Sequence, residues 1–178
     1  SFALRPPAEG PFKHGVASGD PDQSSIMLWT AITADSLDAP VRVQLAEDPE
    51  FQSMLIDAEA APAAEAVRAM TPFKLLADGL QPGRTYWYRF SFGGAVSETG
   101  LTRTLPEGAV DSFKIAAFSC SNYPAGFFNA YRAAAERGDI DLVVHLGDYL
   151  YEYGRGGYAM EDDERLGRVV EPAHEIVS

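Results

Sequence analysis

The chain has 178 residues and a formal net charge of -12, and 46% of its residues are hydrophobic against 22% charged. This is the composition of a globular protein with room for one large domain or two small ones. The acidic balance excludes nucleic acid and anionic membrane surfaces as electrostatic partners, because no stripe of Lys and Arg is present to neutralise phosphates.

Residues 12–106 predict short strands separated by turns. The clearest strand is RTYWYRFSF (84–92), which alternates apolar and polar residues and is followed by a Gly-Gly hairpin turn. This spacing of strands and turns predicts a β-sandwich of the fibronectin III or immunoglobulin type. Residues 1–11 are expected to form an N-terminal leader, and the Ala-rich stretch 58–69 fits either a loop or a short helix.

The stretch LQPGRTY (80–86) resembles the tyrosine corner of fibronectin type III domains, where a buried phenol hydroxyl bonds to the nearby backbone. A plain aromatic strand after a Pro-Gly turn would predict the same fold class. The segment LPEGAVDS (105–112) then carries Pro, Gly and two acidic residues, and we interpret it as a domain boundary.

After this boundary the pattern changes to strand, helix and strand. FKIAAFS (113–119) is a mostly apolar run of strand length, residues 125–138 have helical periodicity and end at Gly138, and IDLVVHL (140–146) is a second strand. Short connections make this a βαβ unit, in which the two strands are parallel. No apolar run is long enough for a transmembrane helix.

The ends of these two strands carry candidate metal ligands. Cys120, the only cysteine, follows the first strand and Asp148 follows the second. Neighbouring parallel strands end about 4.8 Å apart at one sheet edge, so both side chains could reach one ion. Tyr151 could return its phenol to the same point, and Gly147 allows the backbone to bend before Asp148.

Simpler interpretations stay open on spacing alone. Asp148 could be a solvated turn residue or a helix cap, and Cys120 a small buried hydrophobe. The three tyrosines at alternate positions in 149–153 would share one face if the strand continued as an aromatic edge. Asn122 could contact substrate or only form a turn, and His145 could be a hydrogen-bonded core histidine.

Five motifs in order resemble the PhoD family of alkaline phosphatases and phosphodiesterases over nearly the whole chain. They are HGVASGDP, IMLWT, PGRTYWYRF, FSCSNYPAGFFNAY and VVHLGDYLYEYG. The resemblance implies a β-sandwich (12–106) ahead of the N-terminal, βαβ portion (107–178) of a calcineurin-like metallophosphoesterase domain. The Ser-Cys-Ser-Asn turn, in place of Asp-x-His, favours this family over the purple acid phosphatases.

The resemblance also implies a site and an activity, the metal-dependent hydrolysis of phosphate esters. Cys120, Asp148 and Tyr151 would ligate Fe3+, with Asp148 bridging to Ca2+. Asp148 and Asn122 would be the catalytic residues in this part of the chain. Thiolate and phenolate are strong anionic donors suited to a trivalent ion, and carboxylate oxygens suit calcium.

The family's catalytic domain is longer and takes further Asp, Asn and His ligands from later loops. We therefore expect this chain to be an N-terminal fragment that is inactive alone and needs the remainder of the catalytic domain as its partner. A phospholipase D-like phosphodiesterase and a non-catalytic extracellular binding module are the alternative functions. The family is exported, which implies a periplasmic or secreted location.

Overall fold

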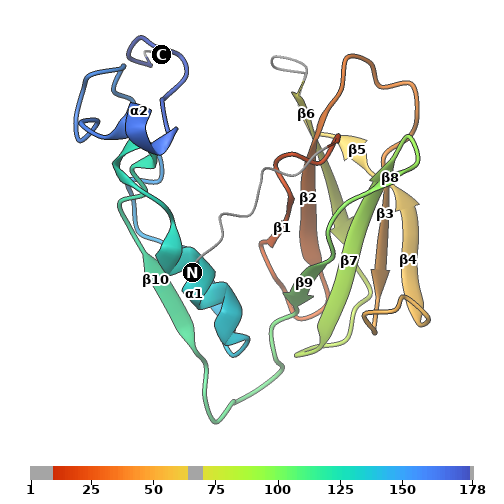
Figure 1. Cartoon of the computed structure of the whole chain (residues 1–178). Helices are drawn as coiled ribbons and strands as arrows, with labels where there is room; N and C mark the ends of the chain where they lie inside the picture. The colour runs from red at the N-terminus through yellow and green to blue at the C-terminus, as the bar shows by residue number, and fades with distance from the viewer. Residues whose placement is uncertain (1–9, 64–69, 177–178) are drawn as a thin grey trace. The chain divides into compact units, whose positions relative to one another are not determined.

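The computed structural model describes residues 10–63 and 70–176, and the chain divides into two compact units between Ala109 and Val110 (Figure 1). Most of the predicted leader and the end of the Ala-rich stretch lie outside the described residues. The first unit is built of strands, and the second combines two strands with short helices. Each unit is described by itself below.

The first unit consists of two antiparallel sheets. One sheet has the order β1-β2-β6-β5, formed by β1 (Val16–Gly19), β2 (Ile26–Thr33), β5 (Ala61–Pro62) and β6 (Met70–Ala77). The other has the order β4-β3-β7-β8, with β9 also paired to β7; its strands are β3 (Arg42–Ala46), β4 (Met54–Glu59), β7 (Thr85–Phe92), β8 (Ala95–Val96) and β9 (Gly100–Arg103).

Both sheets contribute side chains to one hydrophobic core. Strand β7 buries alternate residues, Tyr86, Tyr88, Phe90 and Phe92, as a strand with one covered face must. Leu28 and other residues of β2 lie in the same cluster from the opposite sheet. The prediction of a mainly β-sheet protein is confirmed.

The Pro-Gly turn before β7 is closed by a phenol. Tyr86 is fully buried, and its hydroxyl accepts a hydrogen bond of 2.8 Å from the Gln81 amide. Thr104 supports the same turn by donating from its hydroxyl to the Gln81 carbonyl at 2.7 Å. The buried hydroxyl is therefore paired with backbone, which offsets the cost of removing it from water.

The return strand expected after Gly94 is interrupted, so that it forms β8 and β9 rather than one strand. At the break, the Ser97 hydroxyl accepts the hydrogen bond from the Phe90 amide, while the Ser97 amide donates to the Phe90 carbonyl. A side-chain oxygen thus takes the place of a backbone carbonyl at this point of the ladder. Beyond the break, Gly100 pairs with Tyr88.

In the second unit, β10 (Ile115–Phe118) and β11 (Leu142–His145) pair in parallel. The connection contains the 3₁₀ turn η1 (Tyr123–Ala125) and the helix α1 (Asn129–Arg137), and α2 (Asp163–Leu166) follows later. Helix α1 begins later than the predicted residue 125, because Gly126 has a φ of 156° that no helix accommodates. It ends where predicted, at Gly138 in the left-handed conformation.

The strand pair of the second unit is poorly covered. Ile115 is 57% exposed and Val143 is 58% exposed, and the pleat puts them on opposite faces of the pair. Their aliphatic side chains therefore contribute little of the burial energy that stabilises the first unit.

The interpretation of residues 149–153 as a continuing aromatic edge strand is wrong. Strand β11 ends at His145, and no strand follows it among the described residues. Gly147 and Asp148, with φ values of 134° and 52°, turn the chain out of the extended conformation. The tyrosines therefore do not share a strand face.

The buried corner predicts a cost for Tyr86→Phe. Removing the hydroxyl leaves the Gln81 amide without its partner, so we expect a loss of about 1–2 kcal/mol in the free energy of unfolding of the first unit. Urea unfolding followed by tryptophan fluorescence measures it, because Trp29 and Trp87 both lie in this unit. Tyr153→Phe, an exposed hydroxyl of the second unit, is the control and should leave the transition unchanged. A urea midpoint for Tyr86→Phe equal to that of the wild type would contradict the stabilising role of the corner.

Asp139 predicts an acid-dependent stability for the second unit. Hydrogen bonds from Arg137 and Lys114 hold the pKa of Asp139 well below its usual range. A lowered folded pKa stabilises the unit above the unfolded pKa of about 4, and the contribution is lost as pH falls below it. The melting-temperature gap between wild type and Asp139→Asn should therefore narrow as pH falls from about 6 to about 2. Near-ultraviolet circular dichroism of the tyrosines measures the two melting temperatures. A melting-temperature difference that does not change with pH would contradict the prediction.

Candidate metal centre

The hydrogen bonding between β10 and β11 continues past the ends of both strands. Leu146 donates its amide to the Phe118 carbonyl at 2.8 Å, and Cys120 donates to the Gly147 carbonyl at 3.2 Å. Ser121 donates to the Asp148 carbonyl at 2.8 Å. The two turns that carry the predicted ligands are therefore tied to each other by backbone bonds.

Three predicted ligands meet at one carboxylate oxygen. The Cys120 thiol donates to Asp148 Oδ2, with Sγ and Oδ2 3.5 Å apart. The Tyr151 hydroxyl donates to the same Oδ2 at 3.3 Å. Cys120 and Asp148 are exposed and Tyr151 is half-buried, so the cluster lies open at the end of the strand pair.

The backbone at this cluster is unusual. Cys120 has a φ of 62° and Asp148 a φ of 52°, so both residues occupy the left-handed region that most side chains avoid. A non-glycine residue in this conformation costs on the order of 1 kcal/mol. Such strain persists only where surrounding contacts hold it, and it concentrates at functional sites.

The electrostatics of the cluster suit a cation. Desolvation and the neighbouring Cys120 and Asp148 side chains raise the pKa of the Tyr151 phenol to about 12. Thiolate, carboxylate and phenolate at this separation would repel one another unless a positive charge lay between them. The donor set therefore fits a highly charged cation. Only two of these residues are of the His, Cys, Asp or Glu types, and no group of three such residues is placed to hold an ion in the described part of the chain.

Asn122, two residues after Cys120, offers a further oxygen. Its Oδ1 is buried and has no hydrogen-bond partner, while its Nδ2 donates to the Tyr158 carbonyl at 3.4 Å. A buried amide oxygen without a partner carries a desolvation cost. Amide oxygens are among the ligands that calcium takes in proteins, so the atom fits a Ca2+ ligand.

Arg168 anchors the turn that carries Asn122. Its guanidinium carbon lies 3.8 Å from the centre of the Tyr123 ring, and Nε donates to the Tyr123 carbonyl at 2.6 Å. The rings of Phe127 and Phe128 lie 5.1 and 4.9 Å from the same carbon. Cation–π contacts and one charged hydrogen bond therefore hold this turn against the segment after α2.

Two other arginines that follow Asp148 in the sequence have carboxylate partners. Arg155 pairs with Glu171 and donates to the Val170 carbonyl, and Arg165 pairs with Asp162 at 2.9 Å. Together with Arg168, each is engaged locally in this structure. One guanidinium nitrogen of Arg168, Nη2, is buried without a hydrogen-bond partner.

The structure adds one aromatic residue, Tyr158, that the sequence did not single out. Tyr158 stacks on Tyr151 with ring centres 6.1 Å apart and planes 18° apart. Tyr153 also stacks on Tyr151, at 6.5 Å, and lies tilted by 45° to Tyr158. The stack holds the phenol of Tyr151 beside Asp148. No spacing signal in the sequence pointed to Tyr158.

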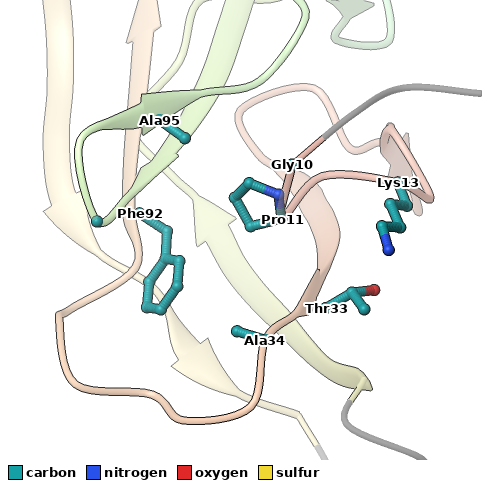
Figure 2. A pocket seen from close by; sticks show the side chains of 8 residues that line it. Gly10, Pro11, Lys13, Thr33, Ala34, Phe92 and Ala95 are labelled. Carbon is teal, nitrogen blue, oxygen red and sulfur yellow. The ribbon is translucent and has the colours of Figure 1, made fainter.

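The first unit carries a separate hollow at the end of β2 and the β7–β8 hairpin (Figure 2). It is open, has a volume of about 460 Å³, and is lined mainly by small and apolar residues with Phe92 and Lys13 among them. Thr33, also in its lining, has a buried hydroxyl without a partner. No thiol or carboxylate lines this hollow.

Two family models match the chain, and both describe parts of phosphatases. The N-terminal domain of PhoD-like phosphatases matches residues 2–106, and the PhoD-like phosphatase model matches residues 115–178. The chain therefore belongs to the PhoD-like phosphatase family. No helix among the described residues has the length and apolar character needed to cross a membrane.

Alkaline phosphatase D of Bacillus subtilis (strain 168) is 38% identical to the chain over 158 residues, which is 83% of this chain and 26% of that protein. A solved structure of PhoD matches with a TM-score of 0.80 at 34% identity, over 98% of this chain and 34% of that one. The chain thus spans about a quarter to a third of the length of these relatives.

A more distant solved structure has a similar fold. Purple acid phosphatase PPD1 from seeds of yellow lupin (Lupinus luteus) matches with a TM-score of 0.56 at 18% identity, over 87% of this chain and 32% of that one. The likeness at this identity is one of fold alone.

The rings of Tyr123, Phe127 and Phe128 form an aromatic cage around Arg168, which predicts a specific effect of Arg168→Lys. Lysine keeps the charge but loses the planar contact with the rings and the Nε bond to Tyr123. We expect amide hydrogen exchange in residues 120–128 to rise roughly 5- to 10-fold, the size of one cation–π contact. Arg165→Lys, at an exposed ion pair, is the matched control. Equal exchange in the two variants would show that the cage does not hold the turn.

Proposed function

We propose that this chain is the N-terminal part of a metal-dependent phosphate-ester hydrolase of the PhoD type. Cys120, Asp148 and Tyr151 would be ligands of Fe3+, and Asp148 would bridge to Ca2+. The observation that carries the proposal is the approach of a thiol and a phenol to one carboxylate oxygen, at 3.5 and 3.3 Å. Membership of a phosphatase family supports it.

The residues fit distinct roles in such a centre. When bound, the cations would neutralise the phosphoryl oxygens and activate water for attack on phosphorus. Asp148 would hold the cluster together with one carboxylate, and Cys120 and Tyr151 would fix its position through their anionic donors. Asn122 would supply an amide oxygen to calcium or an amide N–H to the substrate.

Charge explains why cations would be needed. The chain has a net charge of -12, so a phosphate ester would be repelled on average. The three arginines that follow the cluster are engaged by carboxylates, carbonyls and aromatic rings. Bound cations would then supply the attraction that the protein's own side chains do not.

A complete centre would need residues beyond this chain. We propose that the remainder of the catalytic domain covers the strand pair of the second unit and adds further ligands, and that this chain alone is inactive. The first unit would be a fibronectin III-like sandwich, supported by the buried Tyr86 corner. By family resemblance we place the whole protein outside the cytoplasm, in the periplasm or secreted.

The experiment is Asp148→Ala in the protein at its full natural length. Asp111→Ala, which removes an exposed carboxylate from the segment before β10, is the matched control. We expect the first variant to lose iron and calcium by elemental analysis. We expect its turnover of p-nitrophenyl phosphate and bis-p-nitrophenyl phosphate to fall by more than about 100-fold. This loss exceeds the one expected for a residue that only orients a metal ligand. The control should keep both.

Two results would overturn the proposal. One is an Asp148→Ala variant that retains both metals and turnover. The other is a wild-type protein that is fully folded, free of metal and inactive, which would favour the non-catalytic binding module. The ratio of the two turnover rates then separates a phosphomonoesterase from a phosphodiesterase.

A further inference from the structure

Three polar side chains from three different elements meet behind the turn that carries Cys120. They are Ser121 from that turn, Tyr131 from α1 and His145 from the end of β11. His145 Nε2 lies 2.8 Å from the Ser121 hydroxyl and 2.8 Å from the Tyr131 hydroxyl. The two hydroxyls are also bonded to each other, so the three groups close a triangle.

Aromatic rings pack against two members of the triangle. Tyr131 lies edge-to-face with Phe118, with ring centres 4.6 Å apart, and Tyr149 lies edge-to-face with His145 at 5.1 Å. Ser121 is buried, at 9% exposure. Hydrogen bonds in such a place are less screened by water, and their loss costs more than at an open surface.

His145 reaches both turns of the candidate centre. Through Nε2 it is bonded to Ser121, the residue after Cys120. Through Nδ1 it accepts a long hydrogen bond of 3.4 Å from the amide of Gly147, the residue before Asp148. An Nδ1 that accepts leaves Nε2 to carry the single proton of the neutral imidazole, and the Ser121 and Tyr131 hydroxyls share that N–H as acceptors.

The two turns need such support because their conformations are strained. Cys120 and Asp148 both have positive φ values, and each costs on the order of 1 kcal/mol. The apolar packing of the second unit is thin, since the strand residues Ile115 and Val143 are more than half exposed. A bonded polar triangle is the contact that ties α1, β11 and the Cys120 turn together at this point.

We propose that Ser121, Tyr131 and His145 are positioning residues, which hold Cys120 and Asp148 in the conformations that direct the thiol and carboxylate toward one point. They are not ligands, because the polar atoms of the triangle are engaged with one another and with Gly147. The proposal rests on the proposed function only in taking that point as the place of the metal.

The first test measures the turns without metal. In this structure the Cys120 and Ser121 amides are bonded to the carbonyls of Gly147 and Asp148, and their exchange is to be measured in the metal-free protein at full length. Tyr131→Phe and Ser121→Ala should each raise hydrogen exchange at these two amides about 10-fold, the size of one buried hydrogen bond. Tyr149→Phe removes a hydroxyl from a ring that also touches His145 but lies outside the triangle, and it should change nothing.

The second test uses Fe3+ as the probe, in competition with citrate. Tyr131→Phe and Ser121→Ala should weaken Fe3+ binding about 10- to 100-fold, as groups that orient metal ligands do. They should also shift the visible thiolate and phenolate charge-transfer band, whereas Tyr149→Phe should do neither. Ser121→Thr restores the hydroxyl and should recover the band, which a general loss of packing would not allow.

The outcomes separate this proposal from the proposed function. Unchanged exchange at Cys120 and Ser121 in both variants overturns the positioning role, whether or not iron binds. Raised exchange with wild-type Fe3+ affinity and an unshifted band also overturns it, since the turns would then not direct the ligands. A wild-type protein that binds no Fe3+ refutes the proposed function, while raised exchange in its Tyr131→Phe and Ser121→Ala variants would still show that the triangle supports both turns.

Discussion

The parallel pairing of β10 with β11 is the constraint on which the candidate centre depends. Parallel strands end at the same edge of a sheet, so residues close behind their ends are neighbours although 28 positions separate Cys120 from Asp148. The ladder extends past both strands and fixes the two turns against each other. The approach of thiol, carboxylate and phenol follows from that register.

The two units are stabilised in different ways. The first has side chains from two sheets in one core, with Leu28, Tyr86 and Phe90 fully excluded from water. The second has few buried apolar side chains among its described residues and is held by specific contacts: the Ser121–Tyr131–His145 triangle, the Arg168 cage and the ion pairs of Asp139. Where burial is small, individual hydrogen bonds and ring contacts carry more of the local stability.

The arrangement around Asp148 links strain to chemistry. Left-handed backbone at Cys120 and Asp148 is a cost that a simple strand-to-loop connection would avoid. The tyrosine stack and the polar triangle both limit the freedom of the chain around these residues. A preorganised donor set is what a metal centre requires, because ligands that are already in place need little ordering when the ion binds.

Predictions made from local patterns agreed best with the structure. The alternation in 84–92 and the turn before it depend on residues close in sequence, and the structure has a strand with alternate buried residues and a hydroxyl-closed corner there. The end of helix α1 at Gly138 is equally local, because it needs only a residue that tolerates positive φ. The aromatic edge strand was wrong because alternation of tyrosines says nothing of Gly147 and Asp148 turning the chain first.

The sequence by itself determined the family, the mainly β-sheet class and the choice of Cys120, Asp148, Tyr151 and Asn122 as candidates, because these depend on residue types in a fixed order. Their ligation of a metal stays a prediction. Only the tertiary structure decided how closely the Tyr151 hydroxyl approaches Asp148, that Tyr158 stacks on Tyr151, and that Ser121, Tyr131 and His145 form one network. Those contacts join residues from separate elements, and their geometry exists only once strand register and helix placement are fixed.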